Sequence, residues 1–515
     1  MESLFVPEGE ADLTAALENA PSQVYAPGTT PAYSNYGLAL AGYVVQEVSG
    51  EPFEQYLQEH VFDVAGMDSS SFAQPLPGDL ADRVATGYAT IDDPGHAFET
   101  VGVFPAGSMS ASGTDMGRFM LALMGESTGA GELLNAQTRA LMQSPALDAS
   151  DLGTLSEGQR MTLGFFDESR NGHRILGHGG DTNDFHSALE IYPEDGTGIF
   201  VSMNGSGDGT ANLALRNDLM RGFSDRYFPG EAGNTANGPG GGASDAAPSG
   251  VATGSASDGM TLNAGTADER AAVVAGRYES TRSMHTSFLT ALALIAPTTI
   301  TPLDGGRLLV SPDPGTGEET VFEEISPWVW QEDGGYRRIA AHVDDGQVVR
   351  IGHDSAMSIV PISPVRSAAI PVLAGSLALL ALIVALWALG GILRWRVVRV
   401  PAASGHVEAG APLRWTGRLA RLGALAGLVA AAGWVALAVA LAGSVPVPTI
   451  VVRSIQGLQL LAALGIVPAV TDVVRAVRRR DALPRIVNAV VLSVAMVGLL
   501  AAGIVLHLFS VDVSF

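Results

Sequence analysis

The sequence predicts three successive regions: a mixed α/β segment over residues 1–229, a small antiparallel β domain over 260–365, and four transmembrane helices within 366–515. Three observations carry this division. Helix-period apolar patterns fill the first region, short apolar runs separated by Asp-Gly turns fill the second, and four apolar stretches near 20 residues long fill the third. A linker over residues 230–259, rich in Gly, Ala, Ser and Asn, separates the first two regions.

The charge of the 515 residues is divided in the same way. Residues 1–366 hold 49 of the 53 acidic residues and 17 arginines, whereas residues 367–515 hold 4 acidic residues and 12 arginines. The first part therefore has a net charge of −32 and the second +8, which indicates two environments. So acidic a first part argues against nucleic-acid binding, which needs a basic face.

Two helices follow one another early in the first region. Leu38, Ala41, Val44, Val45 and Val48 repeat at helix spacing, and Ser49-Gly50 ends the run. A second helix begins at Pro52-Phe53, since proline suits the first helical turn. We expect its apolar face to comprise Phe53, Tyr56, Leu57 and Val61.

Hairpin signals define the β domain. The apolar runs are Arg307–Val310, Trp328–Trp330, Tyr336–Ile339 and Val348–Ile351, and the turns between them are Asp304-Gly305-Gly306, Asp333-Gly334-Gly335 and Asp344-Asp345-Gly346. One further apolar stretch, 288–297, is too short to span a bilayer.

The predicted membrane helices run over about 370–393, 422–442, 455–474 and 486–509. Six arginines lie between the first and second helices and five between the third and fourth, whereas the loop between the second and third has only Arg453, at its end. Positive-inside bias then predicts that residues 1–366 and the C-terminus face outward from a cell membrane. An anchor is the simplest role of these helices, because intramembrane ionisable groups that would mark transport are nearly absent.

Three sequence motifs point to an enzyme site. The first is Tyr33-Ser34-Asn35 within Pro27–Gly37, followed by the two helices and by Gly66–Phe72. The second is Pro105–Ser112, a small-residue loop before a helical pattern. The third is His178-Gly179-Gly180-Asp181-Thr182 before the apolar run Phe185–Pro193, with Phe200–Asn204 as its expected neighbour.

In order and spacing these motifs closely resemble the serine β-lactamase and penicillin-binding-protein superfamily, in the branch of class C β-lactamases, D-alanyl-D-alanine carboxypeptidases and related esterases. The resemblance covers residues 1–229 and implies an α/β (α+β) β-lactamase-like serine hydrolase domain, incomplete at its N-terminus. Its chemistry is acyl transfer through a serine ester. The substrates implied are small molecules or peptides: D-amino-acid peptides, β-lactams or small esters.

The resemblance also assigns roles to site residues. Tyr33 would be the tyrosine that takes part in proton transfer, and Asn35 would hydrogen-bond the substrate. His178 would line the site opposite Tyr33, next to Gly179 and Gly180, and contact the substrate carboxylate or its equivalent. The backbone N–H of Asp181 would donate to the oxyanion. Asp181 and Asp184 stand where the family more often has small residues, which leaves the charge preference of the site open.

One part of the family's machinery is missing from the sequence. All 29 basic residues are arginines, so these 515 residues cannot contain the Ser-x-x-Lys nucleophile motif. Ser34, Ser108 and Ser110 are therefore not candidate nucleophiles. Since the motif lies upstream of the tyrosine in the family, we expect a truncated chain, inactive as given, from a longer hydrolase. The absence of lysine throughout also fits a compositional bias.

Other interpretations of the same residues stay open. Tyr33 could cap a turn, Asn35 could be a helix N-cap, and His178 could be a surface histidine. A non-catalytic, outward-facing binding module for cell-wall fragments would equally lack a nucleophile, although a sheet without its N-terminal strands would expose an unpaired edge. A transporter with an accessory ectodomain has only the helix count in its favour.

We expect no cofactor and no metal site. The chain has no cysteine, and His173, His186 and His285 lack metal-ligand spacing. The β domain is weakly similar to lipocalin-like appendages found in some hydrolases of this superfamily, and the sequence assigns it no site.

Overall fold

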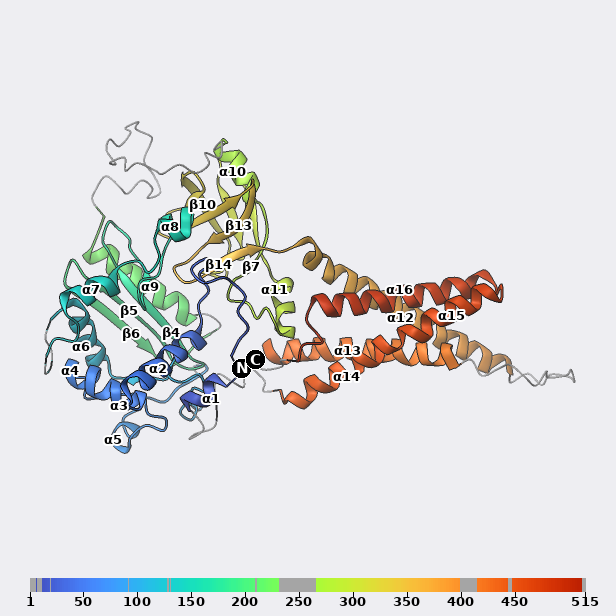
Figure 1. The fold of residues 1–515 in the computed structure, drawn as a ribbon, viewed down its shortest axis with the longest axis horizontal. Helices are drawn as coiled ribbons and strands as arrows, with labels where there is room; N and C mark the ends of the chain where they lie inside the picture. The colour runs from blue at the N-terminus through green and yellow to red at the C-terminus, as the bar shows by residue number, and fades with distance from the viewer. Residues whose placement is uncertain are drawn as a thin grey trace, which may run out of the picture. The chain divides into compact units, whose positions relative to one another are not determined.

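The computed structural model describes residues 6, 12–18, 20–90, 92–126, 129, 131–208, 211–230, 265–398, 415–442 and 447–511. The predicted linker therefore lies outside the described residues, except Gly230. The chain forms two compact units (Figure 1). One comprises residues 3–282 and 297–361, and the other comprises residues 283–296 together with the helices from Ile362 onward.

The first unit begins with a mixed α/β part, as expected. Its helical elements are α1 Leu13–Leu17, α2 Asn35–Ser49, α3 Phe53–Leu57, the π-helix η1 Gln58–Phe62, α4 Asp63–Ala65, α5 Gly78–Ala81, α6 Gly113–Met124, α7 Ala136–Gln143, α8 Ala149–Leu152, the 3-10 helix η2 Gly153–Glu157 and α9 Ala211–Tyr227. Its strands are β1 Ser70–Ser71, β2 Ser110–Ala111, β3 Phe166–Asp167, β4 Leu176–Asp181, β5 His186–Tyr192 and β6 Thr197–Met203.

Strands β3 to β6 form one antiparallel sheet in chain order. Met116 and Met120 of α6 pack on the face that carries Leu176, Leu189 and Ile191. The other face packs against α9, and the Tyr192 ring stacks on Phe228, directly after α9, with centroids 4.4 Å apart. The sheet therefore lies between α6 and α9 (Figure 1), the arrangement that buries both faces.

Helix α2 forms where the apolar repeat predicts it and ends at Gly50, whose φ of 75° suits glycine at a helix C-terminus. Its buried residues are Ala39 and Gly42. A Cβ on Gly42 would lie 2.8 Å from the Pro105 ring, so the helix packs closely there. The predicted apolar repeat is largely on the surface, since Val44 is 51% and Val48 83% exposed.

A closed barrel completes the first unit. Its strands are β7 Gly276–Ser280, β8 Thr298–Pro302, β9 Leu308–Ser311, β10 Thr320–Ser326, β11 Val329–Glu332, β12 Arg338–Asp344, β13 Gln347–Gly352 and β14 Ser358–Pro361, preceded by helix α10 Ala267–Val274. All neighbouring strands are antiparallel, and closure pairs β14 with β7. The Asp345-Gly346 turn has positive φ at both residues, as a tight hairpin requires.

Side chains fill the interior of the barrel. Tyr278, Phe322 and Trp330 are almost completely buried there, together with Ala271 and Val274 of α10. Trp330 donates from Nε1 to the Gly306 carbonyl over 2.9 Å. These side chains form a packed core inside the barrel.

The second unit holds α12 Pro364–Val398, α13 Trp415–Ala442, α14 Thr449–Leu464, α15 Ile466–Arg478 and α16 Leu483–Val505. Four stretches are long and apolar enough to cross a membrane: Pro364–Gly390, Trp415–Leu441, Thr449–Arg478 and Leu483–Val505. These agree in number and approximate place with the predicted helices. The third stretch divides at Gly465, and Pro468 lies in the first turn of α15, where proline is tolerated.

Small residues allow the membrane helices to approach closely. A Cβ on Gly423 would lie 2.8 Å from the Cα of Gly465, and the reverse distance is the same. The short apolar stretch expected within the β domain instead packs with this unit. It forms η3 Phe288–Ala291 and α11 Leu292–Ile295, and Phe288 lies 5.2 Å from Trp434 between ring centroids.

Candidate active site

The predicted site motif His178–Asp181 lies on β4 at a partly open strand edge. Strand β5 pairs with β4 along its whole length, from Leu176 to Asp181. On the other side, β3 pairs only with Leu176 and Gly177. Among the described residues, the stretch from His178 to Asp181 therefore has no strand partner on that side, an edge that an extended ligand could extend.

Tyr33 lies close to His178, although the two residues are far apart in the sequence. Their ring centroids are 6.1 Å apart, and Phe166 of β3 lies 6.3 Å from Tyr33. Phe166 also stacks on the His178 ring at 4.5 Å. The structure thus brings two of the three predicted catalytic residues into one aromatic cluster, with Phe166 as a third member that no sequence motif marks.

Two elements hold the Tyr33 backbone in place. Ser34 caps α2, because its Oγ accepts a hydrogen bond from the Gly37 amide over 3.0 Å. The Tyr33 amide donates to the Ala356 carbonyl over 3.0 Å. Asn35 is the first residue of α2, so the alternative that Asn35 is the N-cap is wrong: Ser34 has that role.

The surroundings of His178 favour the neutral form of its imidazole. Desolvation by the surrounding protein holds the pKa of its imidazole below the usual value, although a hydrogen bond to the Gly179 carbonyl opposes the shift. That bond joins Nδ1 to the carbonyl oxygen over 2.6 Å. With Nδ1 as the donor, Nε2 carries the free lone pair and can accept a proton from a ligand.

The carboxylate of Asp181 belongs to the opposite face of the sheet from His178. Side chains alternate along a strand, and Asp181 bonds Arg216 of α9 at 2.9 and 3.2 Å. His186 also contacts the same carboxylate, over 2.8 Å from its Nδ1. Arg216 of α9 therefore neutralises the charge of the Asp181 carboxylate. That charge was the reason why the sequence left the charge preference of the site open.

Asp184, the second acidic residue where the family more often has a small one, is also paired with a basic side chain. It is buried and lies 2.9 Å from the His96 Nδ1. The hydrogen bond from His96 is the main cause that raises the pKa of that imidazole, followed by the charge of Asp184. Glu99 accepts bonds from Thr182 and from the Asn183 amide, so the segment 96–99 fixes the loop after β4.

A polar cavity of about 290 Å³ adjoins the site on the α9 side. It is lined by Phe166, Glu168, Gly177, His178, Arg216, Met220, Tyr336, Asp354 and Ser355, among others. A Cβ at Gly177 would meet the Leu189 carbonyl and Glu168 at 3.0 Å, so the wall of the cavity is closely packed at that residue.

Glu168 is the unusual acid of this cavity. Desolvation first, and then the charge of Glu190, raise the pKa of Glu168 to about 7. Arg170 opposes these effects but is itself paired with Glu190, at 2.6 Å. The Tyr336 hydroxyl donates to Glu168 over 3.3 Å from the barrel. The junction between sheet and barrel therefore contains an acid that titrates near neutral pH.

The three serines that lack a lysine partner have structural roles. Ser34 is the cap of α2, and the buried Ser108 donates to the Pro105 carbonyl over 3.0 Å. Ser110 lies in β2, opposite Ser71.

The sequence did not indicate several residues of the site region. Arg216, Phe166 and Glu168 come from segments without a recognisable motif, and their positions depend on sheet pairing and on the packing of α9. Arg282, which lies over the Tyr33 ring with its Cζ 4.8 Å from the centroid, comes from the barrel region. A list of arginines would not have distinguished it from the other 28.

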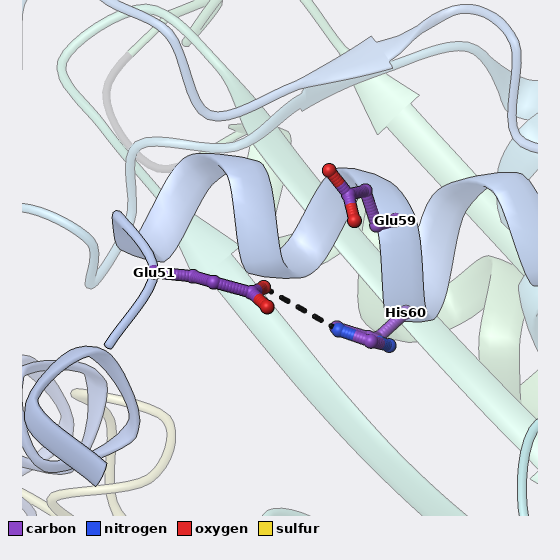
Figure 2. Close-up of side chains that lie close together, drawn as sticks. All are labelled: Glu51, Glu59 and His60. Atoms are coloured by element: carbon purple, nitrogen blue, oxygen red, sulfur yellow. Dashed lines mark ion pairs between the residues drawn. The ribbon is translucent and has the colours of Figure 1, made fainter. Parts of the chain in front are cut away.

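A second cluster of polar side chains lies on the surface, around η1. Glu51, Glu59 and His60 have ligand atoms within 4.8 Å of one another (Figure 2). His60 Nε2 lies 3.4 Å from Glu51 Oε2, and its ring contacts Tyr56 at 4.4 Å. Because Glu59 and His60 are exposed, an ion pair that stabilises this turn explains the cluster without a metal ion.

Comparison with known proteins finds a family match for the first region. Residues 2–220 match the family model of the β-lactamases. Over 40 residues the chain is 42% identical to PbpX of Bacillus subtilis (strain 168), described as a penicillin-binding protein, which is 8% of this chain and 10% of that one. The match thus spans about a tenth of the curated relative.

Two solved structures show partial similarity to this chain. A class C β-lactamase from Rhodobacter sphaeroides is 18% identical, with a TM-score of 0.31 over 41% of this chain and 71% of that chain. An octameric penicillin-binding protein homologue from Pyrococcus abyssi is 16% identical, with a TM-score of 0.29 over 65% and 66%.

The first region is therefore of the class expected from its motifs, with a β-lactamase-like fold. Residues 2–220 match the β-lactamase family model, and the apolar helices that follow the barrel fit a membrane region.

Proposed function

We propose that the protein is a membrane-anchored serine hydrolase of the β-lactamase and penicillin-binding-protein type. It would act outside the cell by acyl-serine transfer on D-amino-acid peptides, β-lactams or small esters. The observation that supports this most is the proximity of Tyr33 and His178, within a segment that matches the β-lactamase family.

The residues at the site fit three tasks of acyl transfer: proton transfer, stabilisation of the oxyanion and binding of the substrate. Tyr33 would exchange a proton with the nucleophile and the leaving group. The backbone N–H of Asp181 would stabilise the oxyanion, and Asn35 would hydrogen-bond the acyl chain of the substrate. Gly179 and Gly180 keep the strand free of side chains, so that an extended substrate can approach the backbone.

The nucleophile is not assigned to any of these 515 residues, because they contain no lysine. In this proposal the chain supplies recognition and proton transfer but does not by itself form the acyl-serine ester. The absence of lysine favours a second candidate function, a binding module that recognises cell-wall peptides or β-lactams without reacting.

Hydrolysis can be tested with the native gene in its own cells. Membranes should release D-alanine from an acyl-D-alanyl-D-alanine peptide or hydrolyse a β-lactam, and Tyr33→Phe should reduce that rate by about 100-fold or more. Tyr36→Phe is the matched control, because Tyr36 lies in the first turn of α2 and its hydroxyl donates to the Leu17 carbonyl. Binding without hydrolysis would favour the second candidate.

The outward orientation is testable by labelling, because the chain has no cysteine of its own. Ser169→Cys and Ala482→Cys place single thiols at exposed positions, in the first unit and between α15 and α16. A membrane-impermeant maleimide should label Ser169→Cys in intact cells and Ala482→Cys only after lysis. The reverse pattern would overturn the orientation.

A further inference from the structure

Arginines gather at one end of the helical unit, where α13 begins and α15 ends. Residues 415–421 and 466–485 contain seven arginines and only two acidic residues. The two helices meet at this end, because Arg475 of α15 donates from Nη1 to the Thr416 hydroxyl of α13 over 3.2 Å. This contact also fixes the direction of the Arg475 side chain. The positive charges therefore lie close together in space and not only along the chain.

The two acidic residues of this end share one arginine. Arg485 of α16 lies 3.0 Å from a carboxylate oxygen of Asp481 and 3.9 Å from one of Asp472. In the part of the chain that the structure describes, no carboxylate pairs with Arg475 or Arg478. The charges of these two arginines are therefore not balanced within the helical unit.

Arg475 and Arg478 lie beside an apolar face of α15. They are three residues apart, so they point to the same side of the helix, and both are exposed. Arg478 also follows Val474 by four residues, which places it one turn beyond that valine. Four exposed valines, which we call the valine stripe, share one face of α15 and are between 44% and 71% exposed: Val467, Val470, Val474 and Val477. The apolar face of α15 thus ends in unpaired cations.

We propose that this end of α13 and α15 binds an anionic phospholipid, with its phosphate at Arg475 and Arg478 and an acyl chain along the valine stripe. The inference concerns the helical unit and goes beyond the proposed hydrolase function. The orientation proposed above would place this site in the cytoplasmic leaflet, where anionic lipids attract basic side chains.

Side chains, and not the backbone, must supply the attraction. A guanidinium presents a planar set of donors that can bind two phosphate oxygens at once. The end of a helix such as α15 exposes carbonyl groups and carries a partial negative charge, which does not attract an anion. Replacing Arg475 and Arg478 should therefore remove the binding, because no amide of this helix end can take their place.

The test compares lipids that differ in the net charge of the headgroup. The full chain in a neutral detergent is titrated with dioleoylphosphatidylglycerol or with dioleoylphosphatidylcholine, and native mass spectrometry measures the dissociation constant of the first bound lipid. We expect the wild type to bind phosphatidylglycerol roughly tenfold more tightly, since each arginine near a membrane surface contributes about fivefold. Arg475→Gln/Arg478→Gln should lose this preference, and Arg475→Lys/Arg478→Lys should keep part of it.

Arg277→Gln/Arg338→Gln is the matched control. It removes two exposed arginines of the barrel and changes the net charge by the same amount, so it should keep the wild-type preference. Equal melting temperatures of the two double glutamine variants would show that the comparison concerns binding and not folding.

Three results would overturn the inference. The first is equal binding of the two lipids by the wild type, a comparison that needs no variant. The second is an unchanged preference in Arg475→Gln/Arg478→Gln. The third is displacement of bound phosphatidylglycerol by glycerol phosphate at equal concentration, because a headgroup without acyl chains would then suffice and the site would be one for free phosphate. No displacement is expected, since the valine stripe contributes to lipid binding.

Discussion

In the barrel each of the eight strands is paired on both sides, whereas the four-stranded sheet of the β-lactamase segment has open edges. Among the described residues, β6 pairs only with β5, and most of β4 lacks a partner on the side of β3. The exposed Val44 and Val48 of α2 lie in the same segment. A closed barrel has no edge to protect, whereas an open sheet relies on neighbours.

This difference gives the barrel a supporting role. It is the self-contained part of the first unit, and it bonds the segment that carries Tyr33 through Ala356 and Met357. Changes in the barrel core should therefore reach the candidate site, whereas changes confined to the site should leave the barrel intact.

The barrel core should be the most sensitive place. Trp330→Ala removes a fully buried ring and its bond to Gly306, and we expect a loss of about 3–5 kcal/mol in the free energy of unfolding. Urea unfolding of the full chain in detergent measures it. Ile325→Ala, at a half-exposed residue of β10, is the control and should cost less than about 1 kcal/mol. Equal costs would contradict a packed barrel.

The buried ion pair under the sheet comes next. Arg170→Met leaves the Glu190 carboxylate buried without its partner, which should cost about 3–4 kcal/mol. The double variant Arg170→Met/Glu190→Gln removes the uncompensated charge and should recover most of that loss. The same urea titration measures the free energy of unfolding of both variants. A double variant as unstable as the single one would show that the loss comes from packing and not from the uncompensated charge.

The free energy of unfolding should depend on pH through Glu168, at the junction between sheet and barrel. The pKa of Glu168 is raised from 4.5 to about 7, so the folded state favours the protonated acid. Its stabilising contribution is complete below about pH 4.5, declines as the pH rises towards 7, and is absent above that. The difference corresponds to at most about 3 kcal/mol, and water in the cavity would reduce it.

Glu168→Gln should therefore flatten the decline of stability between pH 5 and pH 8 and make the protein more stable at pH 8. Glu323→Gln, at an exposed residue of β10, should leave the decline unchanged. Unfolding titrations at the two pH values measure both variants. A glutamine variant at 168 with the wild-type pH dependence would assign the titration to another group.

The smallest effect concerns the cap of α2. Ser34→Ala removes the side-chain oxygen that accepts from the Gly37 amide, at a cost of about 1 kcal/mol. Asn35→Ala should cost less, because Asn35 is the first helical residue and not the cap. Hydrogen exchange of the first turn of α2 reports the difference. The opposite order would restore the alternative in which Asn35 is the cap.

Local patterns in the sequence predicted much of the architecture. The helix after Tyr33, the Asp-Gly turns of the barrel and the four apolar helices each follow from spacing and turn chemistry within a few residues. The closure of the barrel did not follow, because the pairing of β14 with β7 joins strands that are far apart in the chain. Neither did the place of Phe288, whose partners lie in the membrane helices.

The site was predictable in its motifs and not in its surroundings. Tyr33 and His178 stand in segments that the family resemblance marks, and the structure brings them together. Arg216 and Arg282 reach the site through long-range packing, which no local pattern encodes. The sequence also could not show that the charge of Asp181 is neutralised, because its partner Arg216 lies on a helix that is distant in the chain.

The central claim is that sheet and barrel form a recognition site without a nucleophile of its own. Its most direct test is the retention of radiolabelled benzylpenicillin by the purified full chain, before and after denaturation. We predict saturable label on the native protein and none after denaturation. Label that survives denaturation would show an acylated residue among these 515, and no label on the native protein would show that the site does not recognise this ligand; either result would contradict the claim.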